Sequence, residues 1–287
     1  MKFSIVGAAT ILLASIASVK GDALGEAVQK FCGGLDVPSP VQGAYTPGTE
    51  LNFTITNKPG DQYQKVITNL HLYQVEKVDN QDKLVQIQEI WEGRQPLVTK
   101  ASLINKLGES GQLNPGNYYY RSWVSNVIDG GRGPTCTPKS VTFQVTTGSH
   151  VNDAGELEYN EDLLNKDIYN PEHLRGCFGL TIKEPKANQV FTKGEHAHIT
   201  IERNREASTD TIKRIEQYKL ENGNDPVLVE TVFDYDEVIY DFFNLKDNLV
   251  AEAGPNTEYY YKITGNNGQN DECVYFTPKF TIKHEEN

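Results

Sequence analysis

An internal repeat constrains the fold of this chain more than any other feature. Residues 32–55 read CGGLDVPSPVQGAYTPGTELNFTI, and residues 177–201 read CFGLTIKEPKANQVFTKGEHAHITI. Each copy begins with a cysteine followed by Gly-Leu, passes through a proline to a glycine turn, and ends in the alternating apolar residues typical of a strand. The spacing from the cysteine to the turn glycine differs by one residue between the copies.

The similarity continues downstream. Tyr118-Tyr119-Tyr120 returns as Tyr259-Tyr260-Tyr261, and Thr-Pro-Lys occurs at residues 137–139 and again at 277–279. A period of about 145 residues is too long for a solenoid, whose units have about 20–50 residues. In a chain of 287 residues, the repeat therefore predicts two complete domains.

The four cysteines follow the repeat. They allow three pairings, but Cys32 and Cys136 hold the same places in the first copy as Cys177 and Cys273 hold in the second. The repeat thus predicts the disulfides Cys32–Cys136 and Cys177–Cys273. Because zinc-finger spacings and a phosphate-binding glycine loop are both missing, we expect neither a metal nor a cofactor.

Short strand patterns separated by turn residues fill both copies. Leu51, Phe53 and Ile55 alternate with polar residues, and no long segment has a helical period. The pattern predicts an all-β protein with two tandem antiparallel sandwiches of the immunoglobulin or fibronectin type. Further strands are expected near residues 67–75, 84–91, 97–107, 118–124 and 140–145 in the first copy, and near 212–220, 227–233, 238–245, 259–264 and 275–282 in the second.

Composition divides the chain. Residues 1–21 combine Lys2 with a short apolar run and small residues, which predicts a signal peptide cleaved after Ala17 or Gly21. We expect domain 1 at residues 22–147, an acidic solvated linker at 148–175 and domain 2 at 176–287. Within the linker, residues 163–169 are compatible with a helical turn. No other stretch approaches the roughly 20 apolar residues of a membrane span, so the protein is expected to be secreted and to stay extracellular or in the cell wall.

The formal net charge is −12. Nucleic acids and anionic membrane surfaces bind basic patches, so the charge argues against both as partners.

The cysteine with Gly-Leu, the proline, the glycine before a strand, the late tyrosine strand and the second cysteine together resemble secreted immunoglobulin-like modules of fungal cell-surface proteins. The nearest named relatives are the Ser/Thr-rich cell-wall-synthesis (Kre/Knh-type) family. The resemblance covers one copy at a time and implies an immunoglobulin-like fold with a link to β-glucan assembly. This chain has Thr56 and Glu202 where that family commonly has a tryptophan, and it lacks the Ser/Thr-rich tail. The resemblance implies no catalytic residue.

One strand carries the candidate ligand site. In residues 118–124, Tyr118, Tyr120 and Val124 share one face and are expected in the core, which leaves Tyr119, Arg121 and Trp123 on the other face. Two aromatic rings flanking a donor suit a sugar, whose C–H face stacks while its hydroxyls need partners. We therefore expect any carbohydrate to bind domain 1 here. The alternative is that neighbouring elements cover this face.

Three other clusters stand out. His196 and His198 share one face of a strand, but two ligands are too few for a metal, so exposed histidines are expected. Asp234, Asp236, Glu237 and Asp241 form an acidic cluster, interpreted as a solvated turn rather than a calcium site. Asn52 lies in the N-glycosylation sequence Asn-Phe-Thr on the outward parity of its strand, where a glycan is expected.

Signatures of serine hydrolases and zinc proteases are missing from the sequence. We therefore expect a secreted, non-catalytic protein that contacts cell-wall polysaccharide or an extracellular protein. The alternative is a glycan-active enzyme, because the paired carboxylates of such enzymes assemble from distant strands and leave no local motif.

Overall fold

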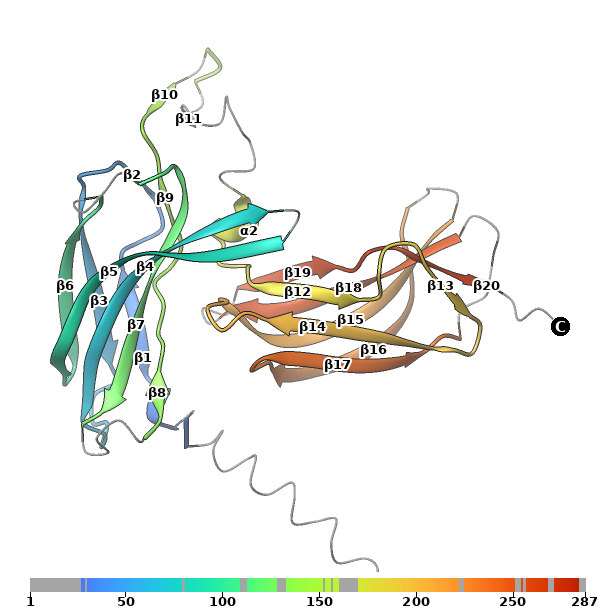
Figure 1. Cartoon of the computed structure of the whole chain (residues 1–287), viewed down its shortest axis with the longest axis horizontal. Coiled ribbons are helices and arrows are strands. Elements are labelled where there is room, and N and C mark those ends of the chain that lie inside the picture. Colours follow the sequence, from blue (N-terminus) through green and yellow to red (C-terminus); the bar gives the residue numbers. More distant parts are fainter. Residues whose placement is uncertain are drawn as a thin grey trace, which may run out of the picture.

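The chain folds into two β-sandwiches, as a computed structural model shows (Figure 1). The structure describes residues 27–283, apart from residues 29, 79–80, 109–112, 128–132, 152, 156, 160–169, 222–224, 251–253, 255–256 and 268–270. The expected signal peptide and the segment 163–169 lie outside the described residues. Within the described part of the chain, no helix has the length and apolar character needed to cross a membrane.

Domain 1 pairs a three-stranded sheet with a six-stranded sheet. The smaller sheet has the order β1 (Leu35–Ser39), β3 (Glu50–Asn57), β6 (Lys100–Lys106). The larger has the order β2 (Ala44–Tyr45), β9 (Phe143–Val145), β7 (Gly116–Asn126), β4 (Lys65–Val78), β5 (Gln81–Leu97), with β8 (Thr135–Cys136) beside β7. Phe53 of β3 meets Tyr120 of β7 across the core, with ring centroids 6.0 Å apart.

Domain 2 repeats this arrangement. Its smaller sheet has the order β12 (Leu180–Glu184), β14 (His196–Arg203), β17 (Phe242–Asn248). Its larger sheet has the order β13 (Gln189–Thr192), β20 (Phe280–Lys283), β18 (Thr257–Asn267), β15 (Thr209–Glu221), β16 (Val227–Val238), with β19 (Glu272–Phe276) beside β18. In both domains the pairs are antiparallel except β2–β9 and β13–β20, which are parallel.

Each domain contains its own disulfide, with the pairing that the repeat predicts. The Cys32–Cys136 and Cys177–Cys273 bridges have Cα–Cα distances of 5.5 and 5.3 Å. Each bridge ties the residues before the first strand of its domain to the strand added beside β7 or β18.

The Thr-Pro-Lys similarity, in contrast, is out of register. The backbone N–H of Tyr120 donates to the Ser140 hydroxyl at 2.9 Å, and the N–H of Tyr261 donates to the Thr277 hydroxyl at 2.9 Å. Ser140 is therefore the structural equivalent of Thr277. It follows that Lys139 corresponds to Phe276, not to Lys279.

The segment between the domains is more structured than a solvated linker. β10 (Ser149–Val151) pairs with β11 (Leu157–Tyr159), and α2 (Pro171–Leu174) follows. The Asn170 side chain caps α2 by accepting from the N–H of Glu172 at 2.9 Å, and a proline occupies its first turn. His173 in this turn is only 2% exposed, so the end of the expected linker belongs to a packed interface.

Candidate functional site

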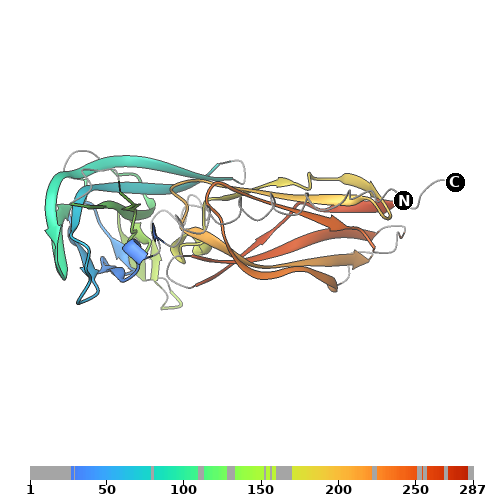
Figure 2. The same cartoon turned by 90° about the horizontal axis from the view of Figure 1, so that it is seen from below.

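The face that carries Tyr119, Arg121 and Trp123 is not an open platform. The strand parity is as predicted, because Tyr118, Tyr120 and Val124 lie in the core of domain 1. However, Tyr119 has no exposed surface, Arg121 is 7% exposed and Trp123 is half-buried. Domain 2 covers this face, which is the alternative stated for it above, so these three side chains do not form the exposed platform expected for a sugar. The β4–β5 arm of domain 1 also extends towards domain 2 in both views (Figures 1 and 2), and β5 contacts β12.

An aromatic stack forms the centre of this domain interface. The Tyr119 ring lies 5.4 Å from that of Tyr73 in β4 and 5.2 Å from that of Phe178 in domain 2, measured between centroids. The Tyr119 hydroxyl donates to the backbone carbonyl of Glu206 at 3.1 Å. Burial raises the pKa of Tyr119 far above its ordinary value, so the hydroxyl remains a donor at neutral pH.

Cations of domain 1 meet acceptors of domain 2 beside this stack. The Arg121 guanidinium lies 4.7 Å over the Trp123 ring and forms an ion pair of 3.0 Å with the Glu206 carboxylate. The Lys139 ammonium donates to the backbone carbonyl of Ala207. Burial, followed by the nearby charges of Arg203 and Arg121, lowers the pKa of Lys139 to about 7. Burial at the interface thus disfavours the charged form of Lys139.

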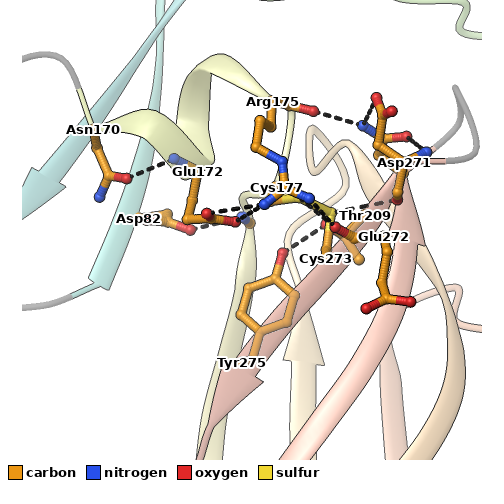
Figure 3. Close-up of a disulfide and its surroundings, with 12 residues drawn as sticks. Asp82, Asn170, Glu172, Arg175, Cys177, Thr209, Asp271, Glu272, Cys273 and Tyr275 are labelled. Carbon is orange, nitrogen blue, oxygen red and sulfur yellow. Dashed lines mark hydrogen bonds and ion pairs between the residues drawn. A yellow bond between two sulfur atoms is a disulfide. The ribbon is translucent and has the colours of Figure 1, made fainter.

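A second polar contact joins the domains at α2. The Asp82 carboxylate, from the β4–β5 arm, lies 2.7 Å from the His173 imidazole and accepts from the Gly179 N–H at 2.9 Å. Burial raises the pKa of Asp82, but the hydrogen bonds and charge of His173, the Gly179 amide and Lys77 together hold it below its ordinary value. Figure 3 shows Asp82 beside α2, next to the Cys177–Cys273 disulfide.

The residues that sequence reasoning missed are Phe178 and Glu206 on domain 2, and Asp82 on the β4–β5 arm of domain 1. The repeat contains one signal for them. Phe178 follows Cys177 where the first copy has Gly33 after Cys32, and Gly33 is exposed. A large aromatic residue at a position where the other copy has glycine indicates a contact that only one copy makes.

The equivalent face of domain 2 is more exposed, with Phe276 exposed and Tyr218, Tyr260 and Lys262 half-buried. We call Tyr218, Tyr260, Lys262 and Phe276 the open aromatic face. Tyr218 of β15 stacks on Tyr260 of β18 at 5.6 Å and 12°, and Phe276 of β19 meets Tyr260 edge-on at 5.9 Å. Phe276 is 58% exposed. A pocket of about 470 Å³ adjoins this face, lined by Arg214, Glu216, Tyr218, Asp234, Tyr235 and Lys262 among others.

The remaining sequence candidates lie on the surface. His196, His198 and Asn52 are exposed on their strands, so the glycosylation sequence is accessible. In the acidic cluster, Asp234 pairs with Arg214 at 3.2 Å and Asp241 pairs with Arg205 at 3.5 Å. Within the described residues, no group of three or more His, Cys, Asp or Glu side chains is placed to hold a metal ion.

One carboxylate is buried in the core of domain 2. Asp247 of β17 is 6% exposed, accepts from the Tyr261 hydroxyl at 2.6 Å and accepts from Gln217 at 3.3 Å. Burial raises the pKa of Asp247, and the Tyr261 hydrogen bond offsets only part of this effect. Domain 1 has Asn105 at the equivalent position, where the amide donates to the Tyr120 hydroxyl at 2.8 Å.

We expect Asp247→Asn to stabilise the protein at neutral pH. A group whose pKa is raised by folding disfavours the folded state at pH values above that pKa, and this penalty disappears on acidification. The amide would also supply a donor near the Gln217 carbonyl oxygen, which has no hydrogen-bond partner among the described residues. The expected gain is about 1 kcal/mol in the free energy of unfolding at pH 8 and less at pH 5, measured by urea unfolding. The reverse swap Asn105→Asp should destabilise domain 1. A loss of stability in Asp247→Asn at pH 8 would show that the carboxylate is favourable.

Comparison with known proteins leaves the function open. No family model matches the chain, and no curated protein matches it. Among solved structures, it is similar to the fibronectin(III)-like modules of CbhA from Clostridium thermocellum, at 13% identity and a TM-score of 0.24, over 88% of this chain and 97% of that one. It is also similar to superoxide reductase (neelaredoxin) from Ignicoccus hospitalis, at 13% identity and a TM-score of 0.24, over 37% of this chain and 80% of that one. Likenesses this weak carry no functional argument. The fold class, two immunoglobulin- or fibronectin-like β-sandwiches in tandem, follows from the sheets themselves.

Proposed function

We propose that this protein is a secreted, non-catalytic binding protein that acts outside the cell or in the cell wall. Its contact surface is the open aromatic face of domain 2. Two disulfides without a free cysteine among the described residues fit an oxidising compartment. The resemblance of each copy to fungal cell-wall modules supports the wall as the site of action, with wall polysaccharide or an extracellular protein as the ligand.

One observation carries this proposal. The same face of the same sheet occurs twice, and in domain 1 it is buried under another domain, whereas in domain 2 it is open. Phe276 at 58% exposure and the stacked Tyr218–Tyr260 pair place apolar area in water. Aromatic residues grouped on an otherwise polar surface are typical of binding sites.

We expect Phe276→Ala to lower binding to insoluble wall material of the producing cells by about tenfold, because central aromatic residues dominate binding energy. The measurement is the fraction of purified full-length protein retained on washed walls over a range of concentrations. Phe242→Ala is the matched control, because Phe242 is 66% exposed in the same domain but lies in the smaller sheet. Equal retention of wild type, Phe276→Ala and Phe242→Ala would exclude the open aromatic face as the contact surface.

A further inference from the structure

We propose that the open aromatic face of domain 2 binds another protein, through an aromatic side chain of that protein lying beside a backbone carbonyl. This inference rests on the proposed function and names the class of its ligand. Its template is the contact that domain 1 already makes with Phe178 and Glu206.

The two faces correspond residue by residue. In domain 1, Tyr73 pairs with Tyr119 between adjacent strands, and in domain 2, Tyr218 pairs with Tyr260 at the same place. The two stacks have nearly the same geometry, with centroid distances of 5.4 and 5.6 Å and interplanar angles of 16° and 12°. The tyrosine stack that packs against Phe178 in domain 1 is therefore repeated in domain 2.

In domain 1 this surface binds a polypeptide edge in two ways. The Phe178 ring packs on Tyr119, and the Tyr119 hydroxyl donates to the Glu206 carbonyl. Among the described residues, the Tyr260 hydroxyl has no acceptor. It is thus free to donate to a carbonyl of a partner in the same manner.

Two differences define what the partner presents. Phe276 stands where domain 1 has Lys139, so an apolar ring replaces a cation that donates to a carbonyl. Lys262 corresponds to Arg121, but it already lies 3.8 Å from Glu216 of its own sheet. The face in domain 2 therefore demands less negative charge from its partner and offers more apolar area.

A second copy of this chain is not the expected partner. Its own Phe178 edge is buried, since Phe178 is 1% exposed. The equivalent edge of domain 1 has Gly33 in place of the aromatic residue and carries Lys58 beside Gly34. That edge offers no ring and would bring a further cation towards Lys262.

A neutral glycan fits the face less well than a protein does. Sugar hydroxyls need polar groups beside the stacking rings. Three ion pairs border this face, Lys262 with Glu216, Arg214 with Asp234 at 3.2 Å and Lys279 with Glu258 at 2.7 Å. These six charged side chains already have partners, which leaves the Tyr260 hydroxyl as the donor that this face offers.

The test uses the full-length protein and a synthetic peptide with the sequence of residues 170–181, in which Cys177→Ser removes the thiol. Because the face in domain 1 is occupied within the chain, this peptide can reach only the face in domain 2. We expect saturable NMR shift changes of Tyr260 and Phe276 at millimolar peptide. Tyr260→Ala and Phe276→Ala should each weaken binding at least about tenfold, and Phe242→Ala should leave it unchanged. A second peptide with Phe178→Ala should not bind.

A soluble β-glucan hexasaccharide serves as the second probe. Binding of the glucan, lost in Phe276→Ala, without binding of the peptide would overturn the protein ligand but leave the proposed function standing. If neither the peptide nor the glucan binds, the inference is also overturned. If Phe276→Ala does not change wall retention either, the proposed function fails with it. Protease treatment of the walls adds an independent arm, because a protein ligand predicts loss of retention and a glycan predicts none.

Discussion

We expect the wild-type chain to unfold in one transition and a Tyr119→Ala variant to unfold as two separate domains. Tyr119 has no exposed surface, its ring packs between those of Tyr73 and Phe178, and its hydroxyl donates a hydrogen bond to the Glu206 carbonyl. Replacing a buried large aromatic residue by alanine costs about 3–5 kcal/mol. Here the loss falls on the contact between domains, because Tyr119 belongs to an interface cluster and not to the core of domain 1.

The measurement follows from where the tryptophans are. The chain has two, Trp91 and Trp123, and both lie in domain 1, so their fluorescence reports that domain while circular dichroism reports both. In Tyr119→Ala the two signals should separate on heating, and the radius of gyration from X-ray scattering should increase. Tyr260→Ala is the matched control, since it makes the same change on the equivalent strand without touching an interface. If Tyr119→Ala still unfolds in one transition with unchanged scattering, the interface does not couple the domains.

Acid should weaken the same interface through Asp82. Folding lowers the pKa of this carboxylate, so its contribution is present above the unfolded-state pKa and is lost as pH falls through the folded-state value. Lys139 acts in the same direction at higher pH. Because burial lowers its pKa to about 7, the cost of burying Lys139 is largest below that pH and decreases as pH rises from there towards the unfolded-state pKa.

Much of the fold follows from comparing the chain with itself. The repeat identifies both disulfides because equivalent cysteines must occupy equivalent places, and strand alternation separates Tyr118 and Tyr120 from Tyr119 because successive side chains point to opposite faces. The Thr-Pro-Lys similarity fails for a physical reason. The structural alignment of the two copies is set by equivalent hydrogen bonds. The backbone N–H of Tyr120 donates to Ser140 and that of Tyr261 donates to Thr277, so the two Thr-Pro-Lys stretches do not align.

The domain interface is beyond this reasoning. Strand parity says which side chains leave the core, but not whether a second domain then covers them. The ion pair between Arg121 and Glu206 joins residues 85 positions apart, and no periodicity connects them. The difference between Phe178 and Gly33 is informative only when the fold shows both positions beside the same sheet. For that reason strand parity predicts which side chains of residues 118–124 leave the core, but it does not predict that domain 2 buries them.

Replacing Cys177 and Cys273 together by serine should lower the stability of domain 2 by about 2–5 kcal/mol, because the bridge closes a loop of about 100 residues in the unfolded chain. The double substitution should also loosen the domain interface, because Cys177 directly precedes Phe178. The same segment is held by Arg175, whose side chain donates to the Glu272 carbonyl at 2.5 Å. The Cys32→Ser and Cys136→Ser pair is the matched control, with a sequence separation of 104 residues against 96. It should destabilise domain 1 by a similar amount, and the scattering of the folded protein should remain unchanged. Guanidinium unfolding followed by tryptophan fluorescence and circular dichroism separates the two domains. If both double variants expand the folded protein equally, the Cys177–Cys273 bridge has no special role in holding Phe178 against Tyr119.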